Sequence, residues 1–231
     1  MKTATLTPLS AKPIVILGGP FGSGKTEVAV NYALLSAHSG RPTTIADLDI
    51  VNPYFRTSGL RAMLEAAGIR VVAPSVRLAQ FDAPALPGEI NTLFDDLASH
   101  SVLDVGGDPV GTAALAGLAS QLGKREYDFW VVVNQRRPQT RELGQIPERV
   151  RELERAARLS VTGLVSNTHL GEQTTVDCVM AGHRMIEQAA AELNLPLAFV
   201  AVTDSITDQV ELDLPVLPIT RHLHLPWEES S

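Results

Sequence analysis

The segment from Gly19 to Thr26 reads G-P-F-G-S-G-K-T and constrains this chain more than any other part of it. It fits the pattern G-x-x-x-x-G-K-[ST], in which glycines turn backbone N–H groups towards phosphate oxygens, the lysine reaches the β- and γ-phosphates, and the final hydroxyl can ligate Mg²⁺. The apolar run before it, residues 13–17, is typical of a strand, and residues 26–38 have the apolar spacing of a helix. A helix N-terminus at that junction favours an anion. The sequence therefore predicts binding of a nucleoside triphosphate. The loop residues expected to hold it are Gly19, Gly22, Ser23, Gly24, Lys25 and Thr26.

Strand-like apolar runs alternate with helical patterns along the rest of the chain. The expected strands lie near residues 13–18, 43–48, 69–73, 101–105, 128–134, 161–166, 197–202 and 215–219. Such runs, apolar enough to be buried on both faces, are typical of a mainly parallel sheet with right-handed crossovers. The 231 residues are 45% hydrophobic, which is enough to fill the core of one such sheet. We therefore expect an α/β, single-domain P-loop NTPase with helices on both faces, spanning residues 1–231 with an extension at 1–12 and a tail at 221–231.

The amino-acid composition limits which partners the protein is expected to bind and which cellular compartment it is expected to occupy. The net charge of −7 and the pI near 5.3 argue against broad electrostatic attraction to nucleic acid or acidic lipid. The single cysteine, Cys178, falls inside a helical pattern, where a buried thiol is expected, and it cannot form a disulfide within the chain. No apolar run approaches the length of a membrane span, and the N-terminus lacks the apolar core of a signal peptide. We expect a cytoplasmic protein with no nucleic-acid partner and no transmembrane segment.

Acidic residues follow two of the expected strands. Ligands of parallel α/β sheets bind at the carboxyl ends of the strands, where the chain has Asp47 and Asp49 in one segment and Asp104 in another. A carboxylate there can hold the hydration shell of Mg²⁺ or orient an attacking water, although aspartate also commonly caps and turns strand ends. Strand alternation puts Asp47 and Asp49 on the same side. We predict catalytic roles for Lys25, Asp49 and Asp47, and a magnesium site at Thr26, Asp47 and Asp104.

The segment after Asp104 is rich in glycine. Gly106 and Gly107 suit a loop that senses the γ-phosphate, with the N–H of Gly107 as a donor to the nucleotide. The alternative is a plain connection in which Asp108 caps a helix that begins at Pro109. The two interpretations are compatible, and for Asp108 capping is the preferred one.

These segments together resemble the MinD/ParA/cobyrinic-acid-synthase-like branch of P-loop NTPases. The resemblance covers residues 13 to about 220 and rests on the loop, on D-x-D-x-x-N-P from Asp47, on D-x-G-G from Asp104, and on the strand that ends at Asn167. It is closer still to a group of bacterial ATP-binding proteins that share the segments D-x-D-I-V-N-P-Y-F-R and D-V-G-G-D.

Members of this branch are mostly ATPases, many of which dimerise around ATP and switch partners, while others are ATP-dependent amide-forming or carboxylating enzymes. The resemblance implies phosphate and magnesium roles for Lys25 and Thr26. It also implies that Asp49 or Asp47 positions water and that Asn167 contacts adenine. A homodimer is an expectation from the same resemblance.

One position departs from the MinD and ParA subgroup, which usually carries an extra lysine early in the loop that reaches the partner's nucleotide. This chain has Pro20 there. Either the chain does not use that mechanism, or another cation replaces the lysine, and the candidates after strand ends are Arg56, Arg136 and Arg137. For Arg136 and Arg137 the preferred interpretation is a solvated basic pair at the start of a loop.

The choice of base follows from a missing motif. The guanine signature Asn-Lys-x-Asp is absent, because the chain reads N-Q-R-R from Asn134 and N-T-H-L from Asn167. Adenine is therefore favoured, and only Asp204 keeps guanine open. We predict a Mg²⁺-dependent ATPase that acts as a nucleotide switch for an unidentified protein partner. An ATP-dependent ligase or kinase of a small molecule is the alternative, and a binding module with negligible turnover is a third possibility.

Overall fold

The computed structural model describes residues 9–49, 60–73, 88–94, 99–107 and 109–223, and these build one parallel sheet with helices on both faces. The eight strands are β1 (Ile14–Gly18), β2 (Thr43–Asp47), β3 (Ile69–Val72), β4 (His100–Asp104), β5 (Tyr127–Val133), β6 (Gly163–Ser166), β7 (Leu197–Thr203) and β8 (Val216–Ile219). The helices are α1 (Lys25–His38), α2 (Arg61–Ala66), α3 (Pro109–Ala116), α4 (Ala119–Leu122), α5 (Gln145–Ala157) and α6 (Val176–Leu193). Short 3-10 segments cover residues 88–94, 138–140 and 204–209. The predicted α/β fold is confirmed.

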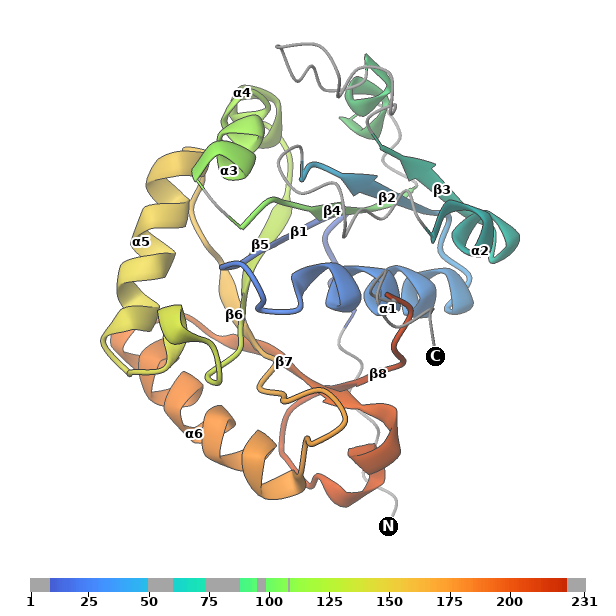
Figure 1. Cartoon of the computed structure of the whole chain (residues 1–231). Helices are drawn as coiled ribbons and strands as arrows, with labels where there is room; N and C mark the ends of the chain where they lie inside the picture. The colour runs from blue at the N-terminus through green and yellow to red at the C-terminus, as the bar shows by residue number, and fades with distance from the viewer. Residues whose placement is uncertain (1–8, 50–59, 74–87, 95–98, 108, 224–231) are drawn as a thin grey trace, which may run out of the picture.

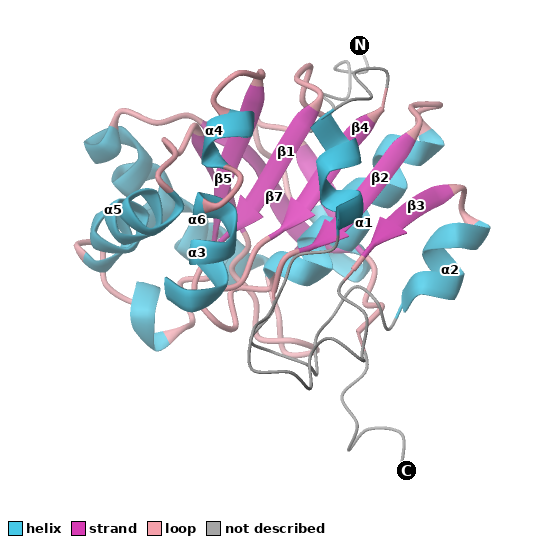
Figure 2. Ribbon diagram, turned by 90° about the horizontal axis from the view of Figure 1, so that it is seen from above, coloured by secondary structure: helices cyan, strands magenta, loops and turns pink. Residues whose placement is uncertain are grey.

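The order of the strands places the phosphate-binding loop at the middle of one sheet edge. The order is β3-β2-β4-β1-β5-β6-β7-β8, and every pair is parallel. The labelled arrows in Figure 2 point in a common direction. β1 therefore lies between β4 and β5, and the loops that follow these three strands emerge side by side. That edge is where parallel α/β sheets bind ligands.

Both faces of the sheet are buried, and alternate residues of β1 pack into the hydrophobic cores on opposite faces. Val15 and Leu17 pack in the cluster that includes α1, whereas Ile14 and Ile16 belong to the cluster that includes α5 and α6. Figure 1 shows α1 and α2 on one side of the sheet, with α3, α5 and α6 on the other. This burial explains why the strands read as nearly continuous apolar runs rather than as an alternation of apolar and polar residues.

The segment after β8 is bound to helix α1. Asn31 exchanges two hydrogen bonds with the backbone of Thr220, and the carboxylate of Glu27 accepts the backbone N–H groups of His222 and Leu223. Burial raises the pKa of Glu27, and these two hydrogen bonds partly offset that rise. The start of α1, which carries the end of the phosphate-binding loop, is thus tied to residues near the end of the described chain.

The cysteine is buried, as the sequence predicts. Cys178 lies in α6, is 6% exposed and is a free thiol, as predicted. Among the described helices none combines the length and the apolar character needed to span a bilayer.

Helix α6 approaches the loop after β6 so closely that we expect Gly182→Ala to destabilise the fold. A Cβ at position 182 would lie 2.5 Å from Cβ of Thr168, a contact that forces the helix or the loop to shift. We expect a loss of about 1–3 kcal/mol in the free energy of unfolding, measured by guanidinium denaturation. Gly144→Ala is the control, because its Cβ would meet nothing within 4 Å and its φ of −65° suits alanine. Equal midpoints for the two variants would contradict this packing argument.

Candidate functional site

The loop between β1 and α1 has the backbone of a phosphate-binding loop. Gly22 and Gly24 have φ of 77° and 84°, in the left-handed region that glycine adopts without strain. The N–H of Ser23 donates to the carbonyl of Pro20 at 3.0 Å, which closes a turn. The loop runs directly into α1, whose first two residues, Lys25 and Thr26, are 7% and 6% exposed. The predicted strand, loop and helix are therefore in place in the order that anion binding requires.

The loop after β4 lies directly against the phosphate-binding loop. A Cβ on Gly107 would lie 2.7 Å from the carbonyl oxygen of Gly19 and 2.8 Å from the backbone nitrogen of Phe21, so only glycine fits there. A Cβ on Gly106 would likewise lie 2.7 Å from Cα of Gly111 in α3. Helix α3 begins at Pro109, as predicted, while Asp108 is outside the described residues. The backbone of Gly107 is therefore packed against the phosphate-binding loop with no room for a side chain between them. The use of its N–H as a phosphate donor stays a prediction.

Three acids and the loop lysine meet at this edge. Nζ of Lys25 lies 3.8 Å from Oδ2 of Asp49, and both side chains are 8% exposed. Oδ1 of Asp47 accepts the backbone N–H of Asp49 at 3.0 Å, so Asp47 turns the chain at the end of β2. The register between β2 and β4 places Asp47 opposite Asp104. Asp49 and Asp104 are thus brought beside Lys25 of the loop, while Asp47 lies opposite Asp104 and forms the turn to Asp49.

Asp104 is the most deeply buried of these acids, with no exposed surface. Burial raises the pKa of its carboxyl to about 6, the charge of Lys25 and the nearby hydroxyl of Thr26 lower it, and Asp49 raises it. Neither carboxylate oxygen completes a hydrogen bond of ordinary geometry with the described residues. A buried carboxylate with open lone pairs beside Thr26 fits the donor chemistry of Mg²⁺, which takes few protein oxygens and keeps waters and phosphate oxygens.

No group of three or more histidine, cysteine, aspartate or glutamate side chains in the described ranges could hold a metal ion. A nucleotide-bound Mg²⁺ typically takes one or two protein oxygens and completes its coordination with waters and phosphate oxygens. The roles predicted for Thr26, Asp47 and Asp104 stay predictions.

The other flank of the loop is formed by residues that follow β5 and β6. Nδ2 of Asn167 donates to the carbonyl of Ser23 at 2.7 Å and sits where a Cβ on Gly24 would collide with it. Asn134 holds the backbone of His169 through two hydrogen bonds of 3.2 and 3.3 Å. Burial, helped by the charge of Arg137, lowers the pKa of His169 to about 4. Asn167 is therefore a support of the loop, and its predicted contact with adenine is untested.

Arg137 is the functional candidate that the sequence interpretation undervalued. Its Nε donates to the carbonyl of Gly22 at 2.8 Å, and its side chain packs on that glycine. The expected solvated pair is thus wrong for Arg137, because the turn after β5, closed by the N–H of Arg137 on the carbonyl of Asn134 at 3.1 Å, brings it back to the loop. Arg136 is exposed and its Nε contacts Sγ of Cys178 at 3.4 Å. Arg56 lies outside the described residues.

A cavity of about 370 Å³ borders the loop on the side of Pro20, the position where the MinD and ParA subgroup has lysine. Its lining includes Pro20 and Gly107, Thr112 of α3, and Arg149 and Glu152 of α5. Arg149 and Glu152 form an ion pair at 2.6 Å. Sequence reasoning could not find this cavity, because Pro20, Gly107 and Arg149, which all line it, are 87 and 42 residues apart along the chain and share no motif.

Comparisons with known proteins give matches in structure only. No family model matches the chain, and no curated protein matches its sequence. Among solved structures, the cell division protein FtsY of Thermotoga maritima matches with a TM-score of 0.60 at 17% identity, over 87% of this chain and 66% of that one. Chloroplast FtsY of Physcomitrella patens gives a TM-score of 0.59 at 18% identity, over 90% and 64%. The 54 kDa signal recognition particle protein of Aeropyrum pernix K1, solved with GDP, gives 0.55 at 16%, over 86% and 43%.

These matches establish the fold but do not identify the activity or the substrate of this chain. The chain spans just under two thirds of the length of the FtsY chains that it matches. Identities of 16 to 18% are compatible with very different activities on one scaffold. The narrower resemblance to MinD and ParA is not confirmed by them. The eight-stranded parallel sheet with its central phosphate-binding loop is the P-loop NTPase fold, shared with FtsY and the 54 kDa signal recognition particle protein.

Proposed function

We propose that this protein is a Mg²⁺-dependent ATPase that acts as a nucleotide switch for a protein partner. The observation that carries the proposal is the convergence of Lys25, Asp49 and Asp104 beside the glycine-rich loop, in a site buried from bulk water. In this proposal Lys25 holds the β- and γ-phosphates, while Thr26 and Asp104 hold Mg²⁺ and its waters. Bound Mg²⁺ neutralises phosphate charge. Asp49 orients the water that attacks the γ-phosphate.

The ion pair between Lys25 and Asp49 supports a switch. A lysine buried to 8% exposure needs a countercharge, and Asp49 provides it at 3.8 Å. A γ-phosphate would compete with Asp49 for the same ammonium group, so nucleotide binding would free the Asp49 carboxylate to hold water. The position of the Asp49 carboxylate would thereby respond to the state of the nucleotide.

The packing of Gly107 supports a second responsive segment. Because Gly107 packs closely against Gly19 and Phe21 and α3 begins two residues later, a rearrangement of the phosphate-binding loop would in this proposal shift the start of α3. Loops that order around a γ-phosphate are a common way for P-loop proteins to alter a protein contact.

Two exposed apolar side chains support a protein partner at this edge. Phe21 is 62% exposed and Leu170 is 47% exposed, and they are the large exposed hydrophobic residues within the described ranges. Phe21 belongs to the phosphate-binding loop, and Leu170 follows His169, which contacts Gly24. A partner or a second copy of the chain that covers them would also cover the nucleotide. A homodimer is one form of this proposal.

The base is proposed to be adenine, because Leu170 stands where the guanine signature has aspartate. Asp204, which kept guanine open, accepts a hydrogen bond from the hydroxyl of Thr220 at 3.2 Å. FtsY of Elizabethkingia anophelis and the 54 kDa protein of Aeropyrum pernix were solved with GDP, so GTP must be compared with ATP when phosphate release is measured.

The cavity beside Pro20 favours a second candidate, an ATP-dependent ligase or kinase. Pro20 of the loop and Gly107 beside the loop both line it, and Arg155, which lines it as well, offers a cation for an anionic acceptor. A volume of about 370 Å³ is enough for a small metabolite. An acceptor in this cavity would lie next to the phosphate-binding loop.

The test is phosphate release from ATP and GTP with and without Mg²⁺, over a range of protein concentrations. We expect Mg²⁺-dependent release from ATP, less from GTP, and a specific activity that rises with protein concentration if two copies assemble. Lys25→Ala controls for contaminating phosphatases. Absence of release from both nucleotides in spite of tight ATP binding would count against the ATPase, and release that needs a small carboxylate or amine would favour the ligase.

A further inference from the structure

A second and larger cavity opens at the edge of the sheet opposite the phosphate-binding loop. Its volume is about 560 Å³, and it lies where β1, β2, β4 and β5 begin. These four strands are neighbours in the sheet, so four separate turns contribute to its lining. The charged and titratable side chains that line it are Lys12, Arg41, His100, Lys124, Arg125 and Glu126.

The charge of this cavity is opposite to that of the whole chain. Four cationic side chains line it against one acid, Glu126, in a protein of net charge −7. The cations come from three turns far apart in sequence, which the fold brings together. Cations gathered at one recess raise its local potential and concentrate anions there.

The arginines are held in place by backbone carbonyls. Nη1 of Arg41 donates to the carbonyl of Ser10 at 2.6 Å, and Nη2 of Arg125 donates to the carbonyl of Phe94 at 2.7 Å. Each guanidinium carries five N–H donors in a fixed planar fork, so further donors remain on both side chains after these bonds. The arginines are thereby oriented, and neither forms an ion pair with an acid among the described residues.

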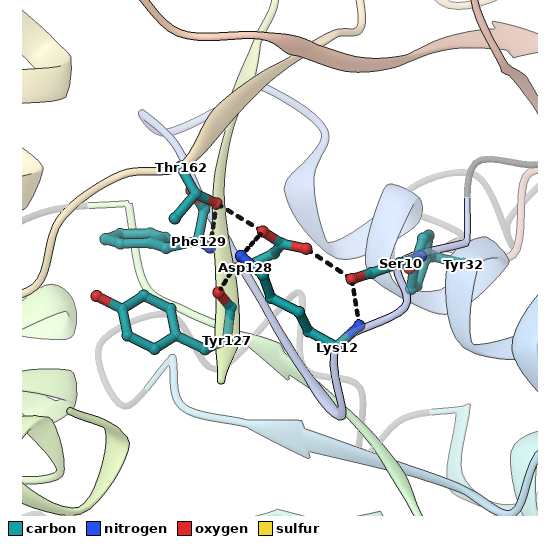
Figure 3. A network of polar contacts seen from close by, with 7 residues as sticks. All are labelled: Ser10, Lys12, Tyr32, Tyr127, Asp128, Phe129 and Thr162. Atoms are coloured by element: carbon teal, nitrogen blue, oxygen red, sulfur yellow. Dashed lines mark hydrogen bonds and ion pairs between the residues drawn. The ribbon is translucent and has the colours of Figure 1, made fainter. Parts of the chain in front are cut away.

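The wall that carries Lys12 is braced by the network drawn in Figure 3. Nζ of Lys12 lies 2.7 Å from Oδ1 of Asp128, and the hydroxyls of Ser10 and Thr162 donate to the same carboxylate at 2.6 and 3.0 Å. Burial raises the pKa of Asp128, but these hydrogen bonds outweigh it and lower the pKa overall. Asp128 therefore remains charged and compensates Lys12. The positive charge available to a ligand is that of Arg41, Lys124 and Arg125, opposed by Glu126.

His100 contributes to the floor as a neutral group. Its Nδ1 lies 2.8 Å from the hydroxyl of Ser36, and the residue is 3% exposed. Burial and the charge of Arg41 lower the pKa of His100 to about 4. The cationic character of the cavity at neutral pH therefore comes from lysine and arginine alone.

We infer that this cavity is a binding site for a small molecule that carries a phosphate or diphosphate group. Two oriented guanidinium forks and a lysine match the donors that phosphate oxygens accept, and guanidinium groups bind phosphate in bidentate fashion. The volume is within the range of metabolite sites, whereas a lining made mostly of charged and polar residues does not suit an apolar ligand. The site is separate from the phosphate-binding loop and would act as a second, regulatory or substrate, position.

The probe is inorganic pyrophosphate, titrated by calorimetry at constant ionic strength into the Lys25→Ala protein, so that the phosphate-binding loop does not contribute. We expect saturable binding that Lys124→Gln weakens about tenfold and that Lys124→Gln combined with Arg41→Gln abolishes. Lys124 is exposed, so its replacement should leave the fold intact even if Arg41→Gln disturbs the contact with Ser10. Arg184→Gln is the matched control, because it removes one exposed positive charge on α6 and should leave the affinity unchanged.

Three results would overturn the inference. Pyrophosphate that does not saturate the Lys25→Ala protein would show that the cavity binds no such anion. Equal weakening by Lys124→Gln and Arg184→Gln would show a general charge effect in place of a site. Citrate binding more tightly than pyrophosphate would assign the cavity to carboxylates. None of these results depends on hydrolysis, so the inference stands or fails independently of the ATPase proposal.

Discussion

Replacing Lys25 with alanine is expected to abolish productive binding of MgATP at the phosphate-binding loop. Lys25 is the buried cation beside the glycine-rich turn, with 8% of its side chain exposed. Its positive charge balances the negative charges of Asp49 and Asp104. Without it, Asp49 and Asp104 would face the triphosphate uncompensated, and the charge-assisted bonds to the phosphates would be lost. We expect affinity to fall by at least about a hundredfold, or about 2.7 kcal/mol, in a calorimetric titration.

Two controls make this result interpretable. Removing Lys25 leaves two buried acids beside each other, so the variant's unfolding must be measured first, and binding compared only at temperatures where it is folded. Arg184→Ala removes an exposed cation from α6 and should bind MgATP like the wild type. Wild-type affinity in the Lys25→Ala protein would mean that the nucleotide binds elsewhere.

Asparagine at position 49 is expected to separate nucleotide binding from hydrolysis. Asp49→Asn removes the carboxylate that we assign to the attacking water, so single-turnover phosphate release should slow by about a hundredfold or more. Binding should be kept or tightened, because Asp49 no longer competes with the phosphates for Lys25, which lies 3.8 Å away. Rapid-quench measurement of one turnover, beside an affinity titration, checks both halves.

Asp47→Asn is the matched comparison. An asparagine oxygen can still accept the N–H of Asp49, the bond that now measures 3.0 Å, so the turn at the end of β2 should survive. We expect a loss of turnover below about tenfold. The opposite order, with Asp47→Asn inactive and Asp49→Asn active, would assign the attacking water to Asp47 and leave Asp49 as the partner of Lys25.

The fold and the chemically active edge could be predicted because their signals are local in sequence. The strand before Gly19 and the helix after Lys25 are each visible in one short window, and the loop between them has fixed spacing. Asp47 and Asp104 could be placed because parallel strands end at a common edge, and the pairing of β2 with β4 puts them opposite each other. The strand–loop–helix pattern and the common edge of parallel strands were therefore enough to place these residues in the fold.

The parts that could not be predicted depend on where turns return the chain. Arg136 and Arg137 are identical neighbours in sequence, and only the geometry after β5 sends Arg137 to Gly22 while Arg136 faces solvent. The role of Asn134 as a support for His169 has the same origin. The cationic cavity is a stronger case, because its lysines and arginines are separated by up to 113 residues and follow no motif.

The hydrogen bond from Asn167 to the carbonyl of Ser23 has a consequence for synthesis on the ribosome. It joins residues 144 positions apart, and β1 gains its neighbour β5 only when residues up to 133 have been made. A nascent chain that ends before residue 167 therefore carries the whole phosphate-binding motif but lacks the side-chain amide of Asn167 that bonds to it. Long-range contacts of this kind form late. We expect nucleotide to stabilise the completed chain and to leave shorter, ribosome-bound fragments unprotected against proteolysis.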